Sequence, residues 1–167
     1  LNYHSYTRDI IDEMRLIGSH VTYVDIQPRS FVFNALRTTR RSLYDSYLRY
    51  HHTAAIAKSK ATAYDKVVFL QAHQMSPENL AQLRAAQPGA EFTLYDWDSL
   101  SNHDYRLQAK WFDRVLTFDP ADARDNGYGY LPLFCSRFMQ GLRRDRAEPG
   151  SLFMVGNIVK PARYAAV

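Results

Sequence analysis

The sequence of 167 residues contains a single cysteine, Cys135, and no hydrophobic run long enough to form a membrane-spanning helix. One cysteine excludes an intramolecular disulfide and cannot supply a zinc-binding cluster. A helix that crosses a bilayer requires about 20 consecutive apolar residues. We therefore expect a domain of the reducing cytoplasm that does not cross the membrane.

The sequence also lacks a glycine-rich phosphate-binding loop of the Walker or dinucleotide type, which disfavours classical ATP or NAD binding. Its content of 46% hydrophobic and 23% charged residues is that of an ordinary globular domain. The net charge of +4 favours an anionic partner such as a nucleotide, a phosphorylated lipid or a membrane surface. No motif for nucleic-acid recognition is present, so we do not expect a nucleic-acid partner.

The hydrophobic periodicity predicts helices that alternate with short apolar strands. Such alternation indicates βαβ units, and therefore an α/β fold with a Rossmann-like, mostly parallel sheet and helices on both faces. Lys66–Leu70 reads as a strand buried on both faces. The expected helices are 5–17, one or two within 34–60, 76–87 and one from Asp119, and the expected strands are 21–26, 66–70, 91–95, 114–118 and 151–155.

Two domains are expected. A βα fold normally begins with a strand that leads into its first helix, whereas this sequence enters a helix almost at once. We therefore interpret residues 1–150 as an N-terminal Rossmann-like domain without its first strand. Residues 151–167 are interpreted as the start of a second domain.

Four segments, taken in order, resemble a family of bacterial glycosyltransferases that act in lipopolysaccharide, capsule and exopolysaccharide synthesis. They are Asp25-Ile26-Gln27-Pro28-Arg29, Tyr95-Asp96-Trp97-Asp98-Ser99 with Asn102, Phe112 to Ala123, and Tyr130-Leu131-Pro132-Leu133-Phe134. The sequence departs from the family at Gln71-Ala72-His73-Gln74, where a lysine-glycine pair is common.

The resemblance implies the GT-B architecture, in which two Rossmann-like domains face a cleft. This chain would be the N-terminal, acceptor-side half, and the nucleotide-sugar donor would bind the second domain. The implied reaction transfers a sugar to a saccharide or lipid-linked acceptor, and the fragment alone would be inactive. The alternative is a non-catalytic Rossmann-like module that binds a nucleotide or a carbohydrate.

Asp98 is the first candidate for a catalytic base, because it follows a predicted strand and ligands of open parallel sheets bind beyond the carboxyl ends of the strands. His4 and His73 are further candidates, since both are expected at the same edge and imidazole accepts protons near neutral pH. Residues that could bind the acceptor are Trp97, Ser99, Asn102 and His103. The competing interpretation is that Asp98 or Ser99 caps the next helix and that Trp97 belongs to the core.

Asp96-Trp97-Asp98 also spells the Asp-x-Asp pattern with which metal-dependent transferases of the GT-A type bind a metal and the donor diphosphate. With 13 aspartates in the sequence, about one such pair arises by chance. We therefore predict no metal site and keep GT-A chemistry as an alternative. Asp119 is expected to cap a helix, because it precedes a proline and Asp122 follows three residues later.

A basic helical stretch is the last feature of note. Arg37, Arg40, Arg41 and Arg49 occur between residues 34 and 60 with a single acid, Asp45. Such a helix could contact anionic lipid headgroups at the inner face of the cytoplasmic membrane, or it could simply face solvent. The three remaining histidines are expected on the surface; they are His20, His51 and His52.

Overall fold

The computed structural model describes residues 4–28 and 30–134, which belong to a unit that spans Leu1–Phe134. Residues 135–167 lie outside the described part. This range includes Cys135, the strand predicted at residues 151–155 and the domain boundary predicted after residue 150.

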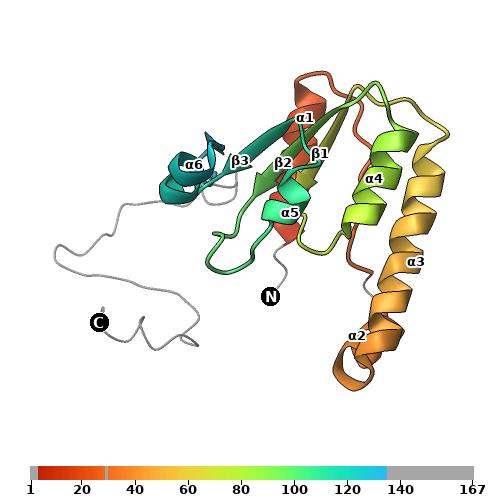
Figure 1. Cartoon of the computed structure of the whole chain (residues 1–167). Helices are drawn as coiled ribbons and strands as arrows, with labels where there is room; N and C mark the ends of the chain where they lie inside the picture. The colour runs from red at the N-terminus through yellow and green to blue at the C-terminus, as the bar shows by residue number, and fades with distance from the viewer. Residues whose placement is uncertain (1–3, 29, 135–167) are drawn as a thin grey trace, which may run out of the picture. The chain divides into compact units, whose positions relative to one another are not determined.

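The described residues form one sheet of parallel strands in the order β1-β2-β3-β4 (Figure 1). The strands are β1 (Lys66–Leu70), β2 (Glu91–Asp96), β3 (Arg114–Thr117) and β4 (Gly129–Tyr130). Successive strands are connected by α4 (Pro77–Ala86), α5 (Arg106–Ala109) and α6 (Pro120–Asn126). The chain from β1 to β4 is therefore a run of βαβ units, and the predicted α/β fold with a Rossmann-like parallel sheet is confirmed.

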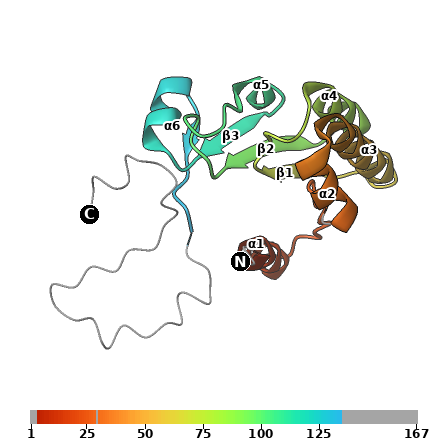
Figure 2. The ribbon, with the colours of Figure 1, turned by 90° about the horizontal axis from the view of Figure 1, so that it is seen from below.

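Helices lie on both faces of this sheet (Figure 2). Helices α3 (Arg41–Ser59), α4 and α5 lie on one face, and α1 (His4–Leu16) lies on the other. The main hydrophobic core lies between the sheet and the face that α3, α4 and α5 cover. Its largest apolar members are Ile56, Phe69, Leu80, Leu83, Phe92, Leu94, Tyr105 and Phe112.

Two helices begin at side-chain caps that precede a proline, and the predicted cap at Asp119 is confirmed. The Ser76 hydroxyl accepts a hydrogen bond from the amide of Asn79 at 3.2 Å at the start of α4. The Asp119 carboxylate accepts hydrogen bonds from the amides of Ala121 and Asp122 at 2.8 and 3.3 Å at the start of α6. In each case a proline follows the cap, as expected for a residue that has no amide proton to satisfy.

The basic stretch forms two helices rather than one. Helix α2 (Phe31–Thr39) ends at Arg40, whose backbone is extended with φ −144° and ψ 91°, and α3 begins at the next residue. The ring of Phe33 in α2 packs against the rings of Tyr44 and Tyr47 in α3. The break therefore folds α2 back onto α3. Among the helices of the described residues, none has the length and apolarity needed to cross a bilayer.

The strand predicted at residues 21–26 does not form; this prediction is wrong. Helix α1 ends before Gly18, which has a φ of +91°, and the chain then runs without helix or strand as far as Pro28. Two histidines of α3 take the place of a neighbouring strand. His51 Nε2 donates to the carbonyl of Asp25 at 2.7 Å, and His52 Nε2 donates to the carbonyl of Ile26 at 2.8 Å.

Strand β1 is also less buried than predicted. Phe69 points into the main core, but Val68, on the opposite face of the strand, is 42% exposed. The strand lies at an edge of the described sheet and pairs only with β2 there. The prediction that β1 is buried on both faces is therefore wrong.

Candidate functional site

The candidate site is the edge of the sheet at which β1, β2 and β3 end. The chain leaves β2 through two tight turns: the amides of Asn102 and His103 both donate to the carbonyl of Ser99, at 2.9 and 3.1 Å. The next helix, α5, begins only at Arg106. The interpretation of Asp98 or Ser99 as a helix cap is therefore wrong, because no helix starts next to either residue.

Asp96 is a buried carboxylate beneath this edge. It continues the alternation of Phe92 and Leu94 along β2 and thus points into the core, where its exposure is 0%. Its Oδ1 accepts the amide proton of Asp98 at 3.0 Å, and its Oδ2 has no hydrogen-bond partner among the described residues. Burial raises the pKa of Asp96 to about 6, although the nearby amides of Asp98 and Ala72 act in the opposite direction.

Asp98 is half-buried and its carboxylate is oriented by Gln71. The Nε2 of Gln71 donates to Asp98 Oδ2 at 2.6 Å, across the ends of β1 and β2. The backbone of Gln71 has a φ of +70°, which costs a residue other than glycine about 1 kcal/mol. The fold thus holds a strained residue at the point where it orients the predicted base.

His73 lies near enough to Asp98 for that carboxylate to act on its pKa, and His103 stacks on His73. Their rings stack with centroids 4.4 Å apart and planes inclined by 5°. Burial lowers the pKa of His73, and the positive charge of His103 lowers it further, whereas the charge of Asp98 acts in the opposite direction. These surroundings favour the neutral form of His73, which is the form that can accept a proton. The structure brings three predicted site residues together: Asp98, His73 and His103.

Trp97 has a packing role. Its ring meets those of Tyr6, Tyr95 and Phe134 edge to face, with centroids 5.8 to 6.4 Å apart. These contacts attach the start of α1 to the end of β2. The interpretation of Trp97 as a packing residue agrees with this geometry, and a sugar could reach only the part of the ring that stays exposed.

The other predicted residues differ in their surroundings. Ser99 is buried and its hydroxyl lies 2.7 Å from that of Ser101, so it points within the turn. Asn102 is exposed at the same turn. His4 is the first residue of α1, and its side chain lies outside the described part of the chain.

Helix α6 supports the loop that contains Asp98. Asp122 Oδ2 accepts the amide proton of Leu100 at 2.7 Å. Asp122 was predicted only as a charge at a helix N-terminus, and this contact across 22 residues could not be read from local sequence. The loop after β2 is therefore held from both sides, by Gln71 and by Asp122.

Gln71 was not predicted as a site residue, and Asp96 was considered only as part of the Asp-x-Asp pattern of the metal-dependent alternative. Gln71 was noted only as a departure from the family pattern, because a left-handed backbone at a glutamine leaves no sequence signal. Asp96 had a signal: it occupies the core-facing position of β2, two residues after Leu94. A carboxylate at such a position is expected to be buried.

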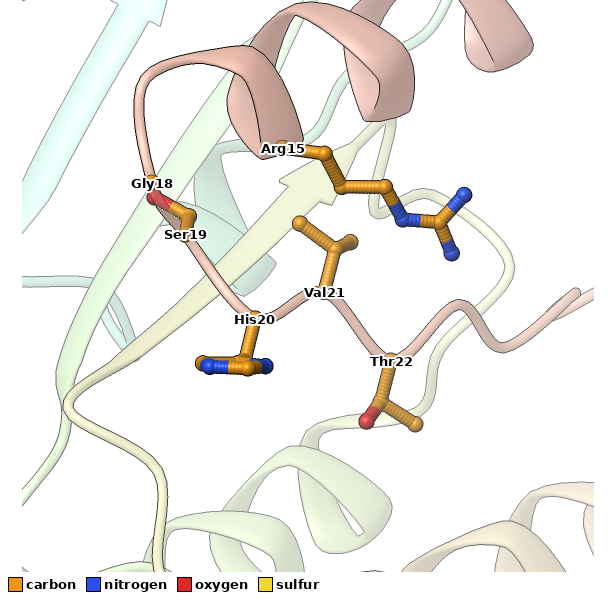
Figure 3. A pocket seen from close by; sticks show the side chains of 6 residues that line it. All are labelled: Arg15, Gly18, Ser19, His20, Val21 and Thr22. Carbon is orange, nitrogen blue, oxygen red and sulfur yellow. The ribbon is translucent and has the colours of Figure 1, made fainter.

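A wide hollow of about 620 Å³ lies at the other end of α1, far along the helix from the contact between Tyr6 and Trp97 (Figure 3). In Figure 3 the side chains of His20 and Thr22 point away from that of Val21. The hollow contains none of the predicted site residues. Across residues 4–28 and 30–134, no three His, Cys, Asp or Glu side chains are grouped in a way that could hold a metal ion.

Comparisons with models of protein families, with curated protein sequences and with solved structures give no match to this chain. The resemblance to glycosyltransferases stays a prediction.

Proposed function

We propose that this chain is the acceptor-side domain of a glycosyltransferase that transfers a sugar from a nucleotide-sugar to a saccharide or lipid-linked acceptor. Asp98 acts as the general base, and the acceptor binds at the edge of the sheet beside Asp98, His73 and His103. The donor binds a second domain.

The observation that supports this proposal most strongly is the contact between Gln71 and Asp98. A general base must be ionised, partly accessible and fixed in direction. Asp98 is half-buried, and the amide of Gln71 occupies one carboxylate oxygen while Oδ1 remains to accept a proton. In the proposed step the acceptor oxygen bonds to the anomeric carbon, the bond from that carbon to the nucleotide diphosphate breaks, and the acceptor proton passes to Asp98.

A second observation is that three of the four family-like segments, those that contain Tyr95, Thr117 and Leu131, meet at this edge. The segment after β4 is tied to the ends of two other strands: Leu131 donates its amide proton to the carbonyl of Thr117 at 2.9 Å, and the Tyr95 hydroxyl donates to the carbonyl of Pro132 at 3.0 Å. Segments that are far apart in sequence thus lie together where open parallel sheets bind ligands. Such an arrangement is expected if the segments serve one site.

The test is turnover by the full-length natural protein with a panel of nucleotide-sugars, measured as release of the nucleoside diphosphate. Asp98→Asn should lower kcat by about 100-fold or more, the usual contribution of a general base, and leave the KM for the donor unchanged. Asp104→Asn is the matched control. Asp104 is an exposed aspartate six residues away that pairs with Arg106, and its replacement should leave turnover unchanged.

Two results would contradict the proposal. One is full turnover by the Asp98→Asn variant. The other is tight binding of a nucleotide-sugar by the isolated 167-residue chain, because the proposal places the donor site in another domain.

A further inference from the structure

Helices α2 and α3 expose large apolar side chains that the fold does not use. Phe31 is 88% exposed and Tyr50 is 72% exposed, and Val32 and Leu43 are 55% and 47% exposed. In Figure 1, α2 is the short orange helix at the lower end of α3. Large exposed apolar residues on two helices that pack together are candidates for a contact with a partner or a membrane.

The exposure of Phe31 and Val32 follows from helical geometry. Phe33 faces α3 and is 3% exposed. Since each residue of a helix turns by about 100°, Phe31 and Val32 lie on other sides of α2 than Phe33. Helix α2 therefore has one apolar side chain that anchors it to α3 and two that point elsewhere.

The same helices contain the positive charge of the protein. Residues 31–60 include six of the 21 lysines and arginines and one of the 17 aspartates and glutamates. Their formal charge is thus +5, and the remaining residues sum to −1. Arg40 and Arg49 are exposed, and Arg37 and Arg41 belong to the same two helices.

We propose that the α2–α3 surface, defined by Phe31, Val32, Arg40, Leu43 and Tyr50, binds the surface of an anionic lipid bilayer. Exposed apolar side chains enter the boundary between headgroups and acyl chains, and arginines bind the anionic headgroups. A nucleic acid would match the charge but not the aliphatic side chains. The proposal is independent of the proposed reaction, so its failure would leave that reaction untouched.

The test is co-sedimentation of the protein with vesicles of phosphatidylcholine alone or mixed with phosphatidylglycerol. The protein should bind the anionic vesicles, and high salt should weaken this binding. The double variant Phe31→Ser, Val32→Ser should lower the partition coefficient about tenfold, and Arg40→Glu should do the same. All three positions are exposed, so these variants should fold.

Matched controls carry the same substitutions elsewhere. Leu107 is 63% exposed on α5 and the Arg124 side chain is 75% exposed on α6, and Leu107→Ser and Arg124→Glu should change binding less than about twofold. Equal losses in the controls, or no binding to anionic vesicles, would overturn the proposal. So would a dimer that Phe31→Ser dissociates, which would assign the surface to a second copy. Binding of a DNA duplex that needs Arg40 but not Phe31 would assign it to nucleic acid.

Discussion

Two buried polar side chains, His52 in α3 and Asp96 at the end of β2, differ in how their hydrogen bonds are satisfied. His52 is 2% exposed, and both of its ring nitrogens have partners. Nε2 donates to the carbonyl of Ile26 at 2.8 Å, and Nδ1 accepts from Asn79 Nδ2 at 3.4 Å. Asp96 is 0% exposed, and one of its two carboxylate oxygens lacks a partner among the described residues.

The difference separates a buried polar group that stabilises the fold from one whose burial costs free energy. A buried polar group that makes all its hydrogen bonds stabilises the fold, whereas a buried polar atom without a partner costs about 1–3 kcal/mol. His52 fastens the irregular segment before α2 to the body of the domain. Asp96 lies directly under the predicted base Asp98, where destabilising features are expected if the edge binds a ligand.

The largest effect is expected for His52→Ala. The variant leaves the Ile26 carbonyl and the Asn79 amide without their partner and opens a cavity, so the free energy of unfolding should fall by about 3 kcal/mol. Chemical denaturation followed by circular dichroism measures this loss. The control is His103→Ala, which removes an exposed imidazole and should cost less than about 0.5 kcal/mol. Equal free energies of unfolding for His52→Ala and His103→Ala would contradict the structural role assigned to His52.

The stabilisation by His52 should also depend on pH. Burial lowers the pKa of His52 from its ordinary value of 6.5, and the charge of His51 lowers it further. Because the unfolded chain then binds the proton more readily, this stability is present above pH 6.5 and is lost as the pH falls toward the lower, folded-state pKa. The difference in stability between wild type and His52→Ala should therefore shrink in acid.

A smaller effect of opposite sign is expected for Asp96→Asn. The rise of the Asp96 pKa from 3.8 to about 6 corresponds to ~3 kcal/mol lost when the buried carboxylate ionises. An asparagine avoids this charge but brings an amide group without a known partner. The variant should therefore be more stable than wild type by about 1–2 kcal/mol at pH 8.

The sign of the Asp96 effect can be tested across pH. Because the folded-state pKa is the higher one, the folded protein binds the proton more readily between pH 3.8 and about 6. The stability of wild type relative to Asp96→Asn should thus fall as the pH rises through this window and stay constant above it. A variant that is less stable than wild type at pH 8 would show that the carboxylate is well satisfied when charged.

Most of the fold could be predicted from sequence because the information is local. The apolar runs at β1, β2 and β3 and the caps at Ser76 and Asp119 each depend on a few neighbouring residues. Residues 21–26 have the composition of a strand, but a strand forms only if another strand supplies its hydrogen bonds. Here two histidines of α3 supply them from 26 residues away.

The position of the candidate site could be predicted from sequence, but the contacts between its residues could not. The position of Asp98 after β2 predicted its edge of the sheet, and His73 and His103 were each expected there. Their stacking and the bond from Gln71 depend on the register of β1 against β2, which pairs Leu70 with Tyr95. His52 was predicted on the surface, which is wrong, because the packing of α4 and the preceding loop against α3 is not visible in a local pattern.

The smallest effect is expected at Gln71. It tests whether the backbone at this edge of the sheet is strained, in addition to the carboxylate oxygen of Asp96 that lacks a partner among the described residues. Gln71→Ala and Gln71→Gly both remove the hydrogen bond to Asp98, so their difference isolates the backbone. At a φ of +70°, the glycine variant should be more stable than the alanine variant by about 1 kcal/mol, because glycine reaches this conformation without a steric cost.

Gly127 provides the reference for that backbone difference. It ends α6 with a φ of +68°, and a Cβ atom added there would meet nothing within 4 Å. Gly127→Ala should therefore cost about the same 1 kcal/mol from backbone conformation alone. If Gln71→Gly and Gln71→Ala proved equally stable while Gly127→Ala showed the full cost, the backbone at residue 71 would relax in the variants. The strain at the edge would then come from the bond between Gln71 and Asp98 itself.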